Sequence, residues 1–145
     1  MANVIPNAFK GELLSGTHNF ASGGNSFKLA LYTGSISSTY TTSSTDYQTN
    51  NEVSSAGSTN YTTTGLVLQN QSVTTGATSF VDFDDLTFSS ATFTAAFGAI
   101  YNDTNSDKLC VVLDFGGSKT ATNGDFKIVF PATGTPANAI ISLAS

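Results

Sequence analysis

Residues 97–115 read FGAIYNDTNSDKLCVVLDF, and the fold class follows from this stretch. Two runs rich in aliphatic, β-branched and aromatic residues, 97–101 and 108–115, flank the polar segment 102–107. Such runs separated by a short turn-forming segment are typical of two antiparallel strands joined as a hairpin. We therefore expect a β-hairpin here, and we expect Gly116 and Gly117 to end its second strand.

Further strand signals lie at short intervals on both sides of this hairpin. Phe27, Leu29 and Leu31 alternate along residues 27–32, so they share one face of a strand. The other predicted strands lie at 66–68, 79–83, 92–93, 125–130 and 139–143. About eight strands with no long helical period predict an all-β protein. We expect an antiparallel β-sandwich that is jelly-roll-like, with an immunoglobulin-like sandwich as the alternative.

The N-terminal region, about residues 1–25, has a different pattern. Asn7 can cap a short helix that carries Phe9, Leu13 and Leu14 on one side and stops near Gly16. Gly11 weakens this helix by about 1 kcal/mol, so it would depend on docking. A short helix and an irregular arm both remain open for this region.

Residues 34–64 are dense in Ser, Thr, Asn and Gly. A structureless loop of this length is unusual inside a compact domain. Because Tyr40, Tyr47 and Tyr61 are spaced through it, we expect a long excursion that its tyrosines partly order, with one or two weak strands. Residues 1–145 are then a single β-sandwich domain.

The composition excludes several classes of protein. Only 10% of residues are charged, no Arg is present, 41 of 145 residues are Ser or Thr, and the net charge is -5. The low count of basic residues argues against nucleic-acid binding. No apolar run approaches the length of about 20 residues needed to cross a membrane, and the N-terminus shows no signal-peptide pattern. Sixteen aromatic residues argue against disorder.

Candidates for a reactive site are few. His18 is the one histidine and Cys110 the one cysteine, which excludes a zinc cluster of these residues and an intramolecular disulfide. The chain does contain the two residue types of a Cys–His catalytic pair, in Cys110 and His18. However, Cys110 lies among Leu109, Val111 and Val112, where a small apolar residue is wanted, so we expect a buried, inert thiol.

The acidic residues give no stronger site. Asp103, Asn105 and Asp107 imitate the start of a calcium loop, but Lys108 stands where such a loop needs Gly. Asp82, Asp84 and Asp85 could serve as paired glycosidase carboxylates, although a solvated strand end is the stronger interpretation. We therefore predict no catalytic, cofactor-binding or metal-binding residue, no cofactor, and a protein that is not an enzyme.

The strand edges bear on partners. Sheets protect exposed edges with Lys, Pro or inward charges, and this chain has five Lys and three Pro for about eight strands. Either the sheets close on themselves or neighbouring subunits cover their edges. We expect a homo-oligomer, a dimer or a trimer.

The N-terminal block, residues 6–20, reads PNAFKGELLSGTHNF. Together with FKLALY at 27–32, AFGAIYN at 96–102 and LDFG at 113–116, it resembles small virion structural proteins of tailed bacteriophages. These are proteins of the capsid decoration or cement type, and the likeness covers most of the chain. The family supplies no catalytic residue to carry over.

This resemblance implies a structural role in a virion, with the protein made in the host bacterial cytoplasm. The expected partners are the major capsid protein and copies of the chain itself. Phe9, Leu13, Leu14 and Phe20 are the candidate docking residues, with ordinary core packing as the alternative. A tail, fibre or head-tail joining component, or a carbohydrate-binding β-sandwich module, stays open as an alternative function.

Overall fold

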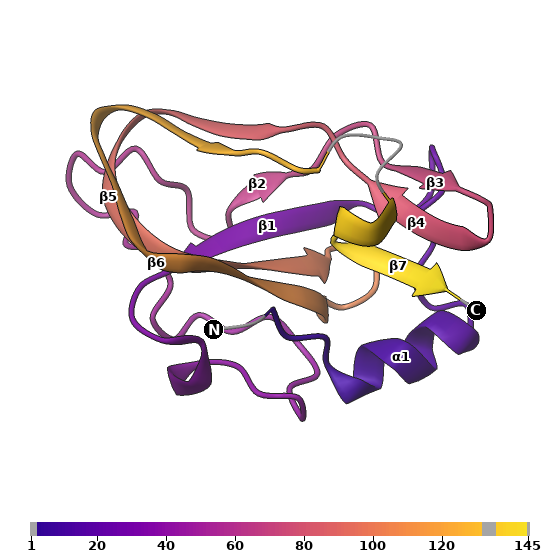
Figure 1. Ribbon diagram of the computed structural model, residues 1–145. Helices are drawn as coiled ribbons and strands as arrows, with labels where there is room; N and C mark the ends of the chain where they lie inside the picture. Colours follow the sequence, from indigo (N-terminus) through magenta and orange to yellow (C-terminus); the bar gives the residue numbers. More distant parts are fainter. Residues whose placement is uncertain (1–2, 132–135, 145) are drawn as a thin grey trace.

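The chain folds into two antiparallel β-sheets and one short α-helix (Figure 1). The structure, a computed structural model, describes residues 3–131 and 136–144. One sheet has the strand order β2-β1-β5-β6 and the other β3-β4-β7. The strands are β1 (Phe27–Tyr32), β2 (Leu66–Val67), β3 (Ser72–Thr74), β4 (Thr78–Asp82), β5 (Leu86–Asn102), β6 (Lys108–Ile128) and β7 (Ile141–Ala144). The predicted all-β class is confirmed.

β5 and β6 form one long hairpin that contributes to two layers of the molecule. Residues 97–102 of β5 pair with residues 108–114 of β6, which confirms the predicted hairpin. Figure 1 shows both strands then curving together into a layer above β1. Their outer halves stay paired there, from Ala95 with Lys119 to Leu86 with Ile128. The short separate strands predicted at 92–93 and 125–130 are therefore wrong, because each belongs to a longer strand.

The bend in β6 comes from its two adjacent glycines. Between two successive paired positions, β5 contains one residue, Ala96, whereas β6 contains residues 115–118. Gly116 and Gly117 adopt φ angles of +70° and +123° within this bulge, conformations that other residues rarely adopt. A bulge increases the bend and twist of a strand without ending its pairing. The prediction that these glycines end the strand is wrong for that reason.

The layer that contains β1 is buried on both faces. Burial alternates along residues 86–95 of β5 but is continuous from 95 to 102, the pattern of a strand covered on two sides. A first core lies between the two layers and includes Leu29, Phe88 and Ile100. A second core, which includes Tyr32 and Phe97, lies on the opposite face of β1 and β5.

The excursion at 34–64 supplies part of that second core. It contains a 3-10 turn, Ile36–Ser38, and no strand, so the predicted weak strands are wrong. Its tyrosines order it as predicted. The hydroxyls of Tyr40 and Tyr32 are hydrogen-bonded at 2.7 Å, and the Tyr61 hydroxyl accepts the backbone N–H of Leu31 at 3.0 Å. Hydrogen bonds to the sheet therefore replace regular secondary structure.

The N-terminal segment forms the helix α1 (Asn7–Leu14), so an irregular arm is excluded for these residues. Asn7 is its first residue and not its cap, because Pro6 occupies the N-cap position. The helix ends before Gly16, as predicted, and this glycine has a φ of +77°. Phe9 is buried, but Leu14 is 92% exposed, so the prediction that both lie on one side is wrong. Within the described residues, no helix has both the length and the apolar character needed to span a bilayer.

Candidate functional site

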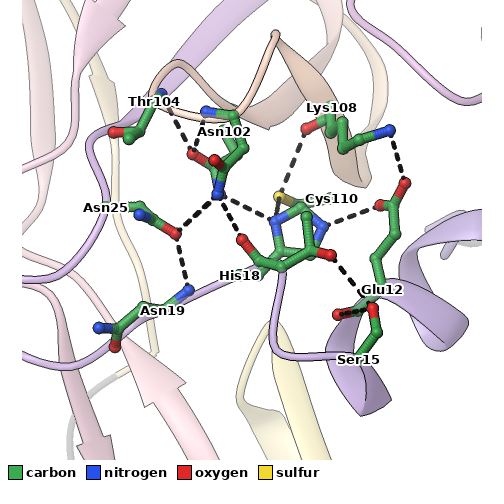
Figure 2. Close-up of polar contacts among 11 residues, drawn as sticks. Glu12, Ser15, His18, Asn19, Asn25, Asn102, Thr104, Lys108 and Cys110 are labelled. Carbon is green, nitrogen blue, oxygen red and sulfur yellow. Dashed lines mark hydrogen bonds and ion pairs between the residues drawn. The ribbon is translucent and has the colours of Figure 1, made fainter.

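A polar cluster lies where α1, residues 17–25 and the turn end of the β5–β6 hairpin meet (Figure 2). It contains the one histidine and the one cysteine of the chain. We call it the His18 cluster, and its members are Glu12, His18, Asn25, Asn102, Lys108 and Cys110.

The turn after α1 brings His18 to this position. The backbone N–H of Thr17 donates to the carbonyl of Glu12 at 2.9 Å, which reverses the chain at the helix end. The imidazole of His18 then lies between two phenylalanines, with ring centroids 5.0 Å from Phe9 and 6.2 Å from Phe20. This packing leaves the His18 side chain with no exposed surface.

Asn102, at the end of β5, determines which atoms of the cluster donate hydrogen bonds and which accept them. Its side-chain oxygen accepts the backbone N–H groups of Thr104 and Asn105, both at 3.1 Å. The amide nitrogen therefore faces the other way, and it donates to His18 Nδ1 at 3.0 Å and to Asn25 Oδ1 at 3.1 Å. Both hydrogens of the amide are used, as the near-complete burial of this residue requires.

This orientation fixes the tautomer of His18. Because Nδ1 accepts a hydrogen bond from Asn102, it carries no proton, and the proton of the neutral ring is on Nε2. Nε2 lies 2.9 Å from Glu12 Oε2 and donates to it. Figure 2 shows the resulting line of contacts from Asn102 through the imidazole to Glu12.

Glu12 ends this line with a second partner on the hairpin. Its other oxygen, Oε1, lies 3.0 Å from Lys108 Nζ at the start of β6. Burial acts to raise the pKa of Glu12, but the hydrogen bonds from His18 and Lys108 outweigh it and hold that pKa below its usual value. The hydrogen bond between Lys108 and Glu12 also raises the pKa of Lys108. The carboxylate thus joins α1 to both His18 and β6.

The two residues of the possible catalytic pair, Cys110 and His18, do lie side by side. The thiol of Cys110, however, is in a form unsuited to catalysis. Its sulfur is 3.8 Å from His18 Nδ1 and 3.7 Å from the carbonyl oxygen of Lys108. Burial, with a smaller contribution from the charge of Glu12, raises the pKa of the thiol well above its usual value. The imidazole nitrogen that would take the thiol proton already accepts from Asn102. The expected buried thiol is confirmed.

A second polar group ties the excursion together around Glu52. The Glu52 carboxylate accepts the hydroxyl of Tyr61 at 2.7 Å, the backbone N–H of Thr64 at 2.8 Å and the hydroxyl of Tyr47. Burial raises the pKa of Tyr61 above its ordinary value, and the hydrogen bond to Glu52 raises it further. All these bonds fasten one part of the chain to another.

The four candidate docking residues separate into two pairs. Phe9 and Phe20 are buried in the chain's own core, and Phe20 stacks on Phe27 with ring centroids 4.3 Å apart. Leu13 is half-buried beside that core, and Leu14 is exposed. Only Leu13 and Leu14 therefore present side-chain surface to a neighbour.

The acidic candidates do not converge. Asp103 pairs with Lys28 at 3.0 Å, and the side chain of Asn105 turns inward to the carbonyl of Thr17. Asp85 pairs with Lys127 at 3.0 Å, a contact that lowers its pKa. In the described part of the chain, no group of three or more His, Cys, Asp or Glu side chains is placed to hold a metal ion.

Sequence reasoning missed most of the His18 cluster. It singled out His18 and Cys110 but none of Glu12, Asn25 and Asn102, which determine what the pair can do. No spacing signal points to them, since 84 residues separate Asn102 from His18.

The fold and this cluster define a class: an all-β protein whose buried polar network fastens its N-terminal helix to a long hairpin. Comparison with protein-family models, with curated proteins and with solved structures finds no match for this chain.

Proposed function

We propose that the chain is a non-enzymatic structural component of a tailed-phage particle, a decoration or cement protein on the outer capsid. One observation carries the proposal: the one histidine and the one cysteine are buried and hydrogen-bonded to fasten the N-terminal block. That block, residues 6–20, is the part of the sequence that most resembles phage virion proteins. Its polar side chains serve to hold the fold together.

The proposed mechanism is mechanical. A jelly-roll-like sandwich, with its inner layer packed on both faces, is a stiff body that adds buried area between capsid subunits. Its partners are the major capsid protein and further copies of the chain. A surface rich in Ser and Thr and poor in charge costs less to desolvate against a flat partner than a highly charged surface does.

The alternatives receive less support from the side chains. A carbohydrate-binding module needs an exposed aromatic face for stacking. Here 14 of the 16 aromatic residues are buried, and the other two, Tyr47 and Phe115, are half-buried. A tail, fibre or head-tail joining component would have the same composition, and only its position in a particle separates it from a decoration protein.

Particles assembled without the protein test this function. The proposal expects normal assembly followed by loss of heat and osmotic stability, both restored when the purified chain is added back. A variant at an exposed residue outside the His18 cluster and the candidate docking residues, Asn50→Ala, is the matched control and should restore stability equally. Particles that keep full stability without the chain, or that fail instead to adsorb to cells, would contradict the cement role.

A further inference from the structure

An apolar groove of about 350 Å³ runs between α1 and the sheet that contains β7. In Figure 1, α1 lies beneath β7. Residues of both elements line the groove. Its walls include side chains from α1, from the segment after it and from β3, β4 and β7. The apolar residues that line it include Leu13, Phe20, Val73, Val81, Ile141 and Leu143.

The groove is uncharged, although the chain carries a net charge of -5. Among the described residues, no Asp, Glu or Lys lines it, and the one titratable side chain there, His18, is buried and hydrogen-bonded within the His18 cluster. Two copies of an acidic chain repel each other over most of their surface. An uncharged patch is where identical surfaces can meet without that repulsion.

A projecting side chain lies beside the groove. Leu14 follows Leu13 in α1 and is 92% exposed, the highest value among the large hydrophobic residues of the described chain. Val73 and Leu143, on the walls, are 48% and 65% exposed. Of the six exposed large hydrophobic residues in the described chain, Val73 and Leu143 line the groove and Leu14 directly follows the lining residue Leu13. Exposed apolar residues concentrated in this way mark an interaction surface.

We propose that two copies of the chain associate through this surface, with Leu14 of each copy inserted into the groove of the other. A two-fold contact requires one patch that carries both the projection and the recess, and the α1–β7 region carries both. A standard interface buries about 800 Å² per partner, roughly a ninth of the 7070 Å² surface of the chain.

The same contact would protect a strand edge. Among the strands that the structure describes, β7 pairs only with β4, and its residues, Ile141–Ala144, contain no charge and no proline. Open edges without such protection recruit other chains. The inference deepens the proposed function, because it names where copies of the chain meet, and it rests on the self-association that this function includes.

Sedimentation equilibrium tests the interface at protein concentrations of about 1 to 200 μM, a range that covers weak and standard affinities. The wild-type chain is expected to form dimers, and Leu14→Asp should weaken dimerisation about 100-fold or more. Val129→Asp is the matched control, because Val129 is 67% exposed but lies outside the groove, and it should dimerise like the wild type. Circular dichroism checks that each variant is folded.

Disulfide trapping gives an independent readout. With Cys110 buried, the double variant Leu14→Cys with Leu143→Cys should form covalent dimers under mild oxidation, whereas Val129→Cys should not. A monomeric wild-type chain over the whole concentration range overturns the inference, as does a Leu14→Asp variant that dimerises normally. Neither result alters the particle-stability experiment, so failure of this interface and failure of the proposed function remain distinguishable.

Discussion

Asn102 is the residue on which the His18 cluster most depends. Its amide satisfies two backbone N–H groups, one imidazole nitrogen and one side-chain oxygen, all in a nearly solvent-free position. Removing the amide leaves several of these buried groups without a partner, and each such group costs about 1–3 kcal/mol. We expect Asn102→Ala to lower the free energy of unfolding by about 3 kcal/mol, measured by urea denaturation.

Asn50→Ala is the matched control for this substitution. The Asn50 side chain is exposed and donates one hydrogen bond, to the carbonyl of Ser38 at 3.1 Å. Its loss should change the free energy of unfolding by about 0.5 kcal/mol or less. Equal losses for the two variants would show that the amide of Asn102 has no special role.

At the scale of elements, Gly65 lies between the end of the excursion and β2, and its backbone packs closely against β1. A Cβ atom built on it would lie 1.9 Å from the carbonyl oxygen of Leu29, and its φ is +76°. The three nearest atoms all belong to the backbone of Leu29 and Ala30 in β1, so no side chain can turn aside to relieve this overlap. We expect Gly65→Ala to lower the free energy of unfolding by about 3 kcal/mol or more, or to prevent folding.

Gly57→Ala separates steric overlap from backbone strain. Gly57 has a nearly identical φ of +74°, but no atom lies within 4 Å of its added Cβ. Its substitution should cost only the left-handed backbone penalty of about 1 kcal/mol. If both variants lost the same stability in thermal or urea unfolding, the close approach of Gly65 to β1 would be disproved.

Glu52 is expected to hold the excursion against the sheet. Its carboxylate accepts from Tyr47, Tyr61 and Thr64, so Glu52→Ala removes three bonds at once. We expect faster hydrogen exchange and faster proteolysis within residues 41–64, while the amides of β1 that are bonded to β5 stay protected. Gln48→Ala, which removes one weak side-chain bond from the same segment, should leave both rates nearly unchanged. Protection lost equally over the whole chain would contradict this local role.

The sequence predicted those elements whose signals are local. Alternation in 27–32 and the polar turn at 102–107 specify β1 and the hairpin, and Gly16 specifies the end of α1. The continuity of β6 through Gly116 and Gly117 could not be predicted, because glycine pairs both end strands and bend them. Whether a glycine pair ends a strand or bends it depends on whether a partner strand stays paired on both sides of the glycines.

The candidate site was less accessible to sequence reasoning. Leu14 was grouped with Phe9, yet the two lie on different sides of α1, because five positions along a helix turn the side chain away from the first. Two partners of His18, Asn102 and Cys110, are 84 and 92 residues away from it in the sequence. Local patterns carry no information on such contacts, whereas the burial of Cys110 followed from its apolar neighbours.

For the whole molecule, the five tyrosines link the fold to pH. They come from β1, the excursion and β5, and burial is the largest cause that raises the pKa of each one, to about 12 for Tyr40. In the unfolded chain each phenol would have a pKa near 10.0. Above pH 10 the folded state therefore binds more protons than the unfolded state, and the free energy of unfolding falls as pH rises.

This linkage predicts that the tyrosines ionise together and only when the chain unfolds. The chain contains no Trp, so tyrosinate absorbance in the ultraviolet follows these five residues without interference. Titrated upward from pH 9, the absorbance should rise steeply above pH 10 and coincide with the loss of the β-sheet circular dichroism signal, because ionising a buried phenol removes its hydrogen bond and places a charge in the core. Tyr40→Phe removes one buried phenol. The free energy of unfolding of this variant should therefore fall less steeply above pH 10 than that of the wild type. If most of the absorbance instead titrated near pH 10 with the sheet signal intact, the phenols would be accessible to solvent in the folded chain, and their burial in the two cores would be disproved.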